Sequence, residues 1–247
     1  MPFQLPAVCR VWLADLLPVA CPLCAMPDPA GRARLCAWCL AALPGRLSHR
    51  CPRCALPRPQ AGTCPSCRRE PSPIDATIAL ADYGPPLDQA IKAFKYRQRP
   101  SLAGPLADAL VDAIRAREPL PCWPTVIVPM PLTDARLRER GFNQASRLAR
   151  ALGKALDLPV LPSALSRSGE PVLAHQAGRS RQARRSADLG RFDGSAALRG
   201  CRVALVDDVM TTGATLQAAA RAVRAAGANR VDAWVLARTI DRPRVGG

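Results

Sequence analysis

The sequence is poor in aromatic residues, at 4%, and contains only two histidines among 247 residues. It has no run of 18 apolar residues, so no transmembrane helix is predicted. The N-terminus lacks a basic segment, and Asp15 interrupts the apolar stretch that follows it. We therefore expect neither a membrane span nor a secretion signal, and the expected compartment is the reducing cytoplasm.

Acidic residues are also scarce relative to basic ones, with 19 Asp and Glu against 35 Lys and Arg, a formal net charge of +16. A strongly basic chain favours polyanionic partners such as nucleic acid or phosphorylated substrates. The segment Arg32–Arg69 contains eight Arg and no acid. A nucleic-acid contact there is one interpretation, and a simple offset of nearby thiolate charge is the other. The scarcity of aromatic residues argues against an extended platform for stacking bases.

Cysteine, by contrast, is abundant and regularly spaced. Eight of the eleven cysteines form four Cys-x-x-Cys pairs, namely Cys21/Cys24, Cys36/Cys39, Cys51/Cys54 and Cys64/Cys67. Two such pairs supply the four sulfurs of one tetrahedral zinc site. Sequential pairing predicts two tandem zinc ribbons over residues 21–70, and an interleaved pairing stays open. Eight thiolates and two zinc ions would lower the net charge to about +12.

Three other uses of these cysteines are less favoured. A disulfide framework needs an oxidising compartment, for which the sequence carries no signal. A thioredoxin-like redox pair needs a βαβ context that is absent around these residues. Iron–sulfur ligands usually follow a different spacing. Structural zinc is therefore the prediction, with His49 as a surface residue because the cysteines fill both sites.

The most informative stretch is Val203–Thr215. Four apolar residues, Val203–Val206, are typical of a buried strand, and Asp207 and Asp208 follow them. A Thr/Gly loop and an Ala-rich helix over 216–226 come next. Phosphate-binding loops have this order, because the loop N–H groups, the Thr hydroxyls and the helix dipole all favour a dianion.

Two adjacent acids at the end of such a strand can accept hydrogen bonds from ribose hydroxyls or hold Mg²⁺. The pattern resembles the phosphoribosyl-pyrophosphate (PRPP) motif of type I phosphoribosyltransferases, with Thr211, Thr212, Gly213, Ala214 and Thr215 as the phosphate loop. An ordinary strand–turn–helix crossover with solvated acids is the alternative interpretation.

A second basic segment follows an apolar strand predicted over 125–130. The loop after it carries Arg136, Arg138 and Arg140, which are well suited to pyrophosphate oxygens, and a helix is predicted over 144–156. The stretch 163–191 has no period and many Arg, and we expect it to be a loop that closes over bound pyrophosphate. Elsewhere we expect strands over 76–83 and 230–237 and helices over 8–17, 86–97 and 102–117.

Taken together, the zinc ribbons, the Lys-Tyr pair at 95–96, Arg-Gly-Phe-Asn-Gln at 140–144 and the Asp-Asp-x-x-Thr-Thr-Gly-Ala-Thr motif resemble the ComF family of competence-associated, phosphoribosyltransferase-like proteins. The resemblance implies a type I phosphoribosyltransferase fold, an α/β mostly parallel sheet flanked by helices, with an N-terminal double zinc ribbon. The implied division is a short helix in 1–20, the ribbons at 21–70 and the phosphoribosyltransferase-like domain at 74–240.

The resemblance also implies roles for particular residues. Asp207 and Asp208 match the acids that hold ribose and Mg²⁺, and Thr211–Thr215 match the 5′-phosphate loop. The pyrophosphate side is matched by Arg136, Arg140, Gly141, Asn143 and Gln144, and a basic mobile loop by Gln176, Gly178 and Arg184. The sequence departs from the family pattern at Ala187, where Asn is frequent, and at Arg97-Gln98, where Gly is common.

The implied function is binding of PRPP with Mg²⁺, together with single-stranded DNA and proteins of the competence machinery during DNA uptake. Two alternatives stay open. One is an active phosphoribosyltransferase of nucleotide metabolism, for which no acceptor-selecting residue is evident in the sequence. The other is a zinc-ribbon adaptor for nucleic acid in which PRPP acts only as a sensor ligand.

Overall fold

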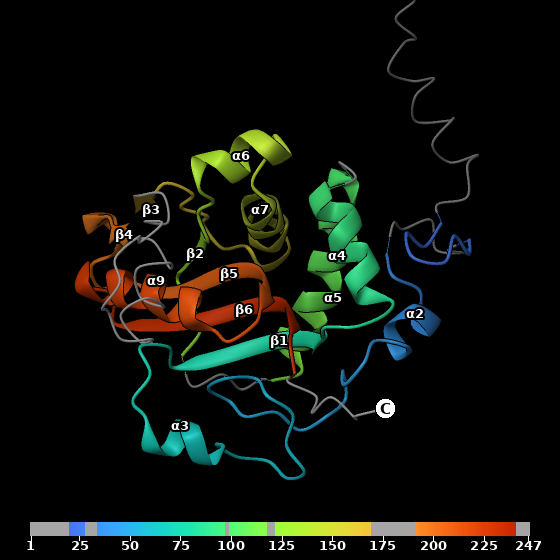
Figure 1. Ribbon diagram of the computed structural model, residues 1–247, viewed down its shortest axis with the longest axis horizontal. Helices are drawn as coiled ribbons and strands as arrows, with labels where there is room; N and C mark the ends of the chain where they lie inside the picture. Colours follow the sequence, from blue (N-terminus) through green and yellow to red (C-terminus); the bar gives the residue numbers. More distant parts are fainter. Residues whose placement is uncertain (1–19, 28–33, 97–98, 118–121, 169–190, 241–247) are drawn as a thin grey trace, which may run out of the picture.

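The computed structural model describes residues 20–27, 34–96, 99–117, 122–168 and 191–240. At its centre lies a four-stranded sheet with the strand order β1-β6-β5-β2. All three pairings are parallel. The strands are β1 (Ala76–Asp82), β2 (Val126–Pro129), β5 (Arg202–Met210) and β6 (Arg230–Arg238). Their carboxyl ends therefore share one edge of the sheet (Figure 1).

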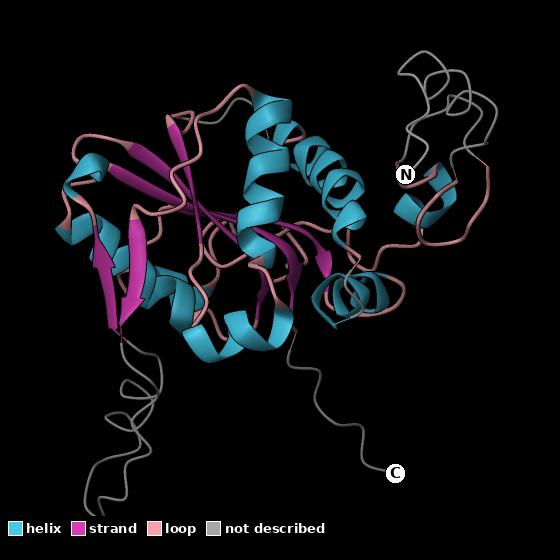
Figure 2. Ribbon diagram, turned by 90° about the horizontal axis from the view of Figure 1, so that it is seen from above, coloured by secondary structure: helices cyan, strands magenta, loops and turns pink. Residues whose placement is uncertain are grey.

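Helices cover both faces of the sheet, as the apolar strands require (Figures 1 and 2). One face packs against α4 (Leu87–Tyr96), α5 (Ala103–Arg115) and α7 (Gln144–Leu156). The other packs against α9 (Ala214–Ala225) and the antiparallel pair β3 (Leu165–Ser168) and β4 (Arg191–Gly194). The expected α/β fold class is thus confirmed.

Strand β5 shows how the sequence divides between the two faces. Val203 and Leu205 belong to the core under α9, whereas Ala204 and Val206 belong to the core under α5 and α7. All four side chains are fully buried, and successive side chains of a strand point to opposite faces. The same alternation continues into the two acids that follow, and it decides what each of them faces.

The N-terminal cysteines form two small units, with α2 (Ala37–Ala41) in the first and α3 (Pro65–Arg69) in the second. The second unit lies beside β1 (Figure 1). The N–H of Thr77 in β1 donates to the Pro52 carbonyl at 2.7 Å, and Asp82 N–H donates to the Pro44 carbonyl at 2.7 Å. The outer edge of β1 is therefore covered by the cysteine-rich segment.

Three sequence expectations need correction. The strand with the two acids runs on to Met210, so the acids lie within β5 and not after it. The basic stretch after β2 is a helix, α6 (Asp134–Arg140), capped by Thr133 at its start and by Gly141 with φ +75° at its end. The stretch 163–191 is not all loop, since β3 and β4 occupy its two ends.

The helices expected over 86–97, 102–117, 144–156 and 216–226 are present as α4, α5, α7 and α9, with ends displaced by at most two residues. Two short 3₁₀ turns, Pro100–Leu102 and Ala196–Leu198, complete the described elements. The helix expected over 8–17 lies outside the described residues. Within those residues, no helix has the length and apolar character needed to cross a membrane.

Candidate functional site

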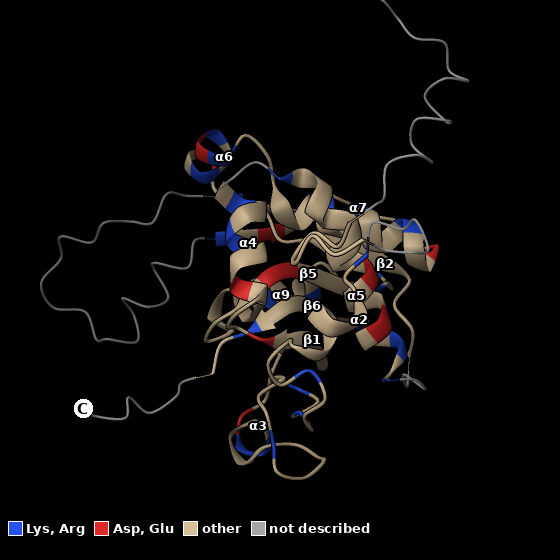
Figure 3. Cartoon of the chain, turned by 90° about the vertical axis from the view of Figure 1, so that its right-hand side faces the viewer, with Lys and Arg blue, Asp and Glu red and all other residues tan. Residues whose placement is uncertain are grey.

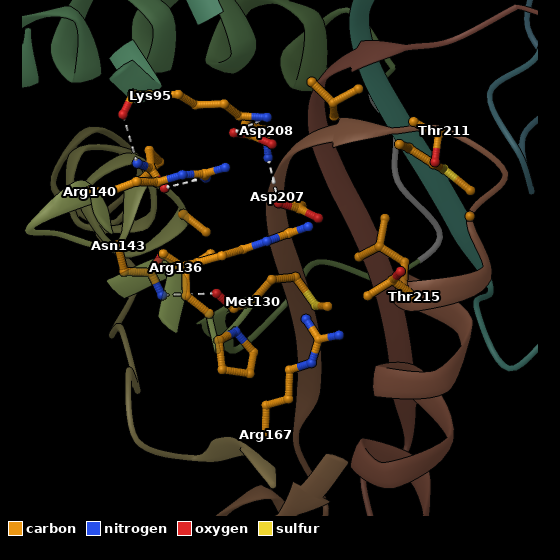
Figure 4. Close-up of a pocket in the computed structure, with 18 of the residues that line it drawn as sticks. Lys95, Met130, Arg136, Arg140, Asn143, Arg167, Asp207, Asp208, Thr211 and Thr215 are labelled. Carbon is orange, nitrogen blue, oxygen red and sulfur yellow. Dashed lines mark hydrogen bonds and ion pairs between the residues drawn. The ribbon is translucent and has the colours of Figure 1, made fainter. Parts of the chain in front are cut away.

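A cavity of about 570 Å³ opens at the carboxyl edge of the sheet. Its lining includes the two acids of β5, part of the Thr/Gly loop, and cationic side chains from three separate elements (Figure 4). Ligands of open parallel sheets bind at this edge, because loops and helix N-termini converge there. The cavity is therefore the candidate site.

The two acids face different partners. Asp208 shares the side of β5 that faces α4, and its Oδ2 lies 2.9 Å from Nζ of Lys95, the penultimate residue of α4. Asp207 is half-buried, and one of its oxygens accepts a hydrogen bond from the Asp208 N–H at 2.8 Å. The site thus presents one carboxylate with a lysine counter-ion and one without a direct ion pair among the described contacts.

This difference appears in the pKa of Asp207. Burial and the neighbouring Asp208 carboxylate raise the pKa of Asp207 to about 7, against the smaller opposing effects of the Asp208 N–H, Lys95 and Arg136. A carboxylate pair in which one member resists ionisation lacks positive charge. It is suited to a cation or to hydroxyl donors.

The loop between β5 and α9 is shaped by glycine. Gly213 is the N-cap of α9 and has φ +83°, and a Cβ there would collide with the Met210 side chain. Since Gly213 has no side chain to cap the helix, the first-turn N–H groups of α9 that follow Ala214 keep their capacity to donate. The Thr212 hydroxyl accepts from Ala214 N–H at 3.3 Å, which stiffens the turn.

Helix α6 supplies positive charge on the opposite side. Arg136 and Arg140 are one turn apart and both line the cavity, whereas Arg138 does not. Arg140 donates to the Tyr96 hydroxyl at 3.1 Å, and its guanidinium carbon lies 5.0 Å from the centre of that ring. The arginine is thus held in place without neutralising its charge.

The start of α7 connects these parts. Asn143 caps the helix, accepting from Ser146 N–H at 3.1 Å and donating to the Met130 carbonyl at 3.0 Å. The buried side chain of Gln144 accepts from Arg140 at 3.1 Å and donates to the Lys95 carbonyl at 3.5 Å. Asn143 and Gln144 therefore fix the positions of β2, α6 and α4 around the cavity.

Most of the predicted site residues come together. The cavity is lined by Asp207, Asp208, Thr211, Gly213, Thr215, Arg136, Arg140, Asn143 and Gln144. Thr212, Ala214 and Gly141 support the turns but are not among the lining residues. Gln176, Gly178 and Arg184 lie outside the described residues. The roles assigned to all these residues stay predictions.

Four polar lining residues had no assigned role in the sequence. Lys95 was visible only as part of the Lys-Tyr pair, and Arg167 comes from β3, inside a stretch expected to be loop. Burial and nearby Arg136 lower the pKa of Arg167, which the Asp207 carboxylate partly offsets. Tyr83 and Thr239 follow the ends of β1 and β6. No local sequence signal marks these four, because only the fold brings them to the edge.

The eight cysteines form two separate clusters, Cys21/Cys24/Cys36/Cys39 and Cys51/Cys54/Cys64/Cys67, each with its sulfurs within 4.8 Å of one another. The sequential pairing is thus the correct one. The sulfurs of Cys24 and Cys36 are 3.6 Å apart and those of Cys54 and Cys64 are 3.8 Å apart. Tetrahedral zinc with bonds of about 2.3 Å requires sulfur separations of about 3.8 Å, so both clusters fit zinc.

Backbone N–H groups favour the thiolate form of the first cysteine in each cluster. Burial raises the pKa of the Cys21 thiol, but N–H groups of Cys36, Cys24 and Leu23 outweigh it and leave the pKa at about 6. The same competition leaves the pKa of Cys51 at about 7. In each cluster the first cysteine is thus set up as a thiolate, the form that binds zinc.

Comparison with protein families agrees with both halves of this description. The phosphoribosyl transferase domain family matches residues 137–245, and the double zinc ribbon domain family matches residues 12–68.

The charge distribution in Figure 3 shows acidic residues on β5 and basic residues on α4 and α6. Fold and site together define a phosphoribosyltransferase-like protein that carries two zinc ribbons.

Individual relatives identify the family within this class of protein. The DNA utilization protein YhgH of Escherichia coli K12 is 30% identical over 238 residues, covering 91% of this chain and 99% of the relative. Competence protein F of Haemophilus influenzae is 32% identical over 180 residues, covering 71% and 78%. The chain belongs to the ComF family. A solved adenine phosphoribosyltransferase is 18% identical with a TM-score of 0.39, covering 59% of this chain and 74% of that one, too distant to carry any argument.

Proposed function

We propose that the protein binds PRPP together with Mg²⁺ in the cavity at the sheet edge. The observation that carries the proposal is the convergence on one cavity of a carboxylate pair, a glycine-shaped loop before α9 and arginines from α6. A sugar diphosphate carrying a further phosphate needs these three features side by side. A zinc ribbon or a parallel sheet alone needs none of them.

The arrangement suggests how the ligand lies. The 5′-phosphate would take the loop Thr211–Thr215, where N–H groups and the positive end of α9 favour a dianion. The ribose hydroxyls would donate to Asp207 and Asp208. The pyrophosphate would meet Arg136 and Arg140, whose planar forks suit phosphate oxygens.

The donor set also suits Mg²⁺. Burial and the adjacent Asp208 carboxylate raise the pKa of Asp207, a cation beside the pair would favour its ionised form, and carboxylate oxygens are ligands that Mg²⁺ takes. Asp207 and Asp208 would hold the ion with pyrophosphate oxygens. When bound, it would offset charge on the pyrophosphate group.

Phosphoribosyl transfer is the second candidate, favoured by the distribution of charge along the cavity. In such a transfer the bond from C1 of ribose to the pyrophosphate oxygen breaks as a bond from C1 to the acceptor forms. The pyrophosphate leaves with the bonding electron pair. Because the arginines lie toward β2, the acceptor would enter from the side of β6 and β1, where Tyr83 and Thr239 line the cavity.

We further propose that the protein acts with single-stranded DNA. The net charge of +16 and the names of its relatives, which refer to DNA utilization and competence, support this. PRPP would then act as substrate or as a sensor ligand that alters the affinity for nucleic acid. The reduced thiolates of the two ribbons fit a reducing compartment, and we propose the cytoplasm. The division at residues 21–70 and 74–240 stays part of this proposal.

Calorimetric titration with PRPP and Mg²⁺ tests the first proposal. We expect saturable binding in the wild type and none in Asp207→Asn, with Asp112→Asn, exposed on α5, as the matched control. Absence of binding in the wild type would reject PRPP as the ligand. Pyrophosphate release with purine, pyrimidine or nucleic-acid acceptors then distinguishes turnover from sensing.

The DNA proposal has its own test. The logarithm of the affinity for an oligonucleotide of single-stranded DNA should fall linearly with the logarithm of salt concentration, because phosphate contacts release counterions. An affinity that is independent of salt would contradict it. Measuring the same affinity with and without saturating PRPP tests the sensor hypothesis, because coupling between the two ligands must be reciprocal.

A further inference from the structure

Arg238, the last residue of β6, joins the second zinc ribbon to the phosphate loop. The residue is only 5% exposed. Its Nε donates to the Cys54 carbonyl at 2.8 Å. Its Nη1 donates to the carbonyls of Met210 and Thr211, the former at 3.2 Å. One buried guanidinium thus contacts a zinc ligand residue and the first residues of the loop.

These contacts orient the loop as well as holding it. In a trans peptide the carbonyl and the next N–H point in opposite directions. When the carbonyls of Met210 and Thr211 point to Arg238, the N–H groups of Thr211 and Thr212 point away from it. Hydrogen bonds from a charged donor are among the stronger ones in proteins.

The second ribbon is itself fixed to the sheet. Arg50 precedes Cys51 and is only 5% exposed. Its Nη2 lies 2.8 Å from Oδ1 of Asp82, at the end of β1. The Thr77 hydroxyl of β1 donates to the Arg53 carbonyl at 2.6 Å. In the sheet, Asp82 and Met210 are the register partners of Arg238 on its two sides. The second ribbon, the ends of β1, β5 and β6, and the phosphate loop are therefore connected by direct contacts.

The first ribbon has a different neighbour. Its Arg34 pairs with Asp108 of α5 at 3.4 Å, and the two side chains are 52% and 38% exposed. Within the described part of the chain, we find no hydrogen bond that joins Cys21, Cys24, Cys36 or Cys39 to the phosphate loop. The two ribbons are therefore alike in ligands but differ in what they hold.

We propose that zinc in the second ribbon sets the conformation of the phosphate loop through Arg238, and that zinc in the first ribbon does not. Arg238 is a positioning residue, since it contacts the loop and not the ligand. Loss of the second zinc would loosen the loop and lower the affinity for a sugar phosphate. Only the identity of that ligand rests on the proposed function.

Hydrogen–deuterium exchange tests the coupling without any ligand. The matched variants are Cys67→Ser in the second ribbon and Cys39→Ser in the first, each expected to retain one zinc. We expect amide exchange over residues 210–216 to rise at least tenfold in Cys67→Ser and to stay at the wild-type rate in Cys39→Ser. Equal exchange rates in the two variants would overturn the proposal.

Arg238→Lys decides the question even where Cys67→Ser fails to fold. Lysine keeps the charge but cannot reach the carbonyls on both sides, so loop exchange should rise while both zinc ions are retained. Arg224→Lys is the control, because Arg224 also donates to carbonyls, those of Pro73 and Asn229, away from the loop. An unchanged loop in Arg238→Lys would reject the bridge.

Ligand binding gives a second and separable measurement. If the wild type binds PRPP, the same variants should weaken binding in the same order, and PRPP should slow zinc release from the second ribbon only, by linkage. If the wild type does not bind PRPP, the proposed function fails while the exchange experiment still decides the coupling. Zinc release that is slowed equally in both ribbons would contradict the proposal.

Discussion

Lys95 and Asp208 form an ion pair of 2.9 Å between α4 and β5, with side chains 19% and 11% exposed. The lysine ammonium therefore lies against one of the two carboxylates proposed to hold a divalent cation. Lysine and metal would compete for the same charge. Binding of PRPP would offer Lys95 phosphate oxygens in exchange.

The variant Lys95→Gln should therefore bind Mn²⁺, a paramagnetic substitute for Mg²⁺, more tightly than the wild type in the absence of PRPP. Removing one positive charge a few ångströms from the ion favours binding by about 1 kcal/mol or more, which is at least fivefold in affinity. The measurement is free Mn²⁺ by electron paramagnetic resonance during titration. Lys92→Gln, which removes a largely exposed lysine paired with Asp88, is the control. Equal Mn²⁺ affinity in both variants would show that Lys95 does not compete for the metal.

The raised pKa of Asp207 gives stability a pH dependence. With a folded pKa of about 7 and an ordinary value of 3.8, the group contributes stability below about pH 4 that is lost as pH rises to about 7. The amide of Asp207→Asn does not ionise, so this variant does not lose stability in this way as pH rises. Its melting temperature should match the wild type near pH 4 and exceed it above pH 7, where its free energy of unfolding should be higher by about 1–2 kcal/mol after allowance for partial solvation.

Thermal unfolding across pH 4–8 checks this difference curve, with Asp112→Asn as the control whose curve should follow the wild type. A destabilised Asp207→Asn above pH 7 would be inconsistent with an unfavourable carboxylate. Stabilisation together with lost PRPP binding would identify Asp207 as a residue kept for binding at the expense of stability.

The buried pair Arg50–Asp82 should be costly to break. Arg50→Met leaves the Asp82 carboxylate without its counter-ion and should lower the free energy of unfolding by about 3–5 kcal/mol. Adding Asp82→Asn removes the stranded charge and should restore part of the loss. Urea denaturation of both single variants and the double variant measures the coupling. Strictly additive losses would mean that the pair is not coupled.

Each ribbon should hold its own zinc ion. Cys21→Ser and Cys51→Ser remove one ligand from different clusters, and each variant should retain one zinc per chain, because metal binding supplies most of the folding free energy of such small units. Metal analysis of the purified chains is the measurement. Two zinc ions in either variant would refute the ligand assignment, and Cys122→Ser, outside both clusters, should retain two.

Local pattern was enough for the features that depend on adjacent residues. The Cys-x-x-Cys spacing predicted both metal clusters, and Val203–Thr215 predicted strand, loop and helix in order. The sequence left open which Cys-x-x-Cys pairs share one metal, because sequential and interleaved pairing both satisfy the spacing. The pairing is settled by the chain path, which brings Cys36 back to Cys21 before the second ribbon begins.

Features that depend on distant residues could not be predicted from local patterns. Lys95 and Arg167 reach the cavity from segments that share no motif with β5, and Arg238 lies just beyond the strand predicted over 230–237. The acids were placed after the strand because charged residues usually end a buried run. In the structure β5 continues to Met210, because β6 pairs with it as far as Arg238.

The covering of β1 has a practical consequence. Thr77 and Asp82 give their N–H groups to Pro52 and Pro44, so the cysteine-rich segment occupies an edge on which another strand could otherwise pair. A chain stripped of its second zinc would present that edge open. Chelators in a purification buffer would then do more than remove a metal: they would expose a strand edge through which chains can associate, at a rate rising with protein concentration.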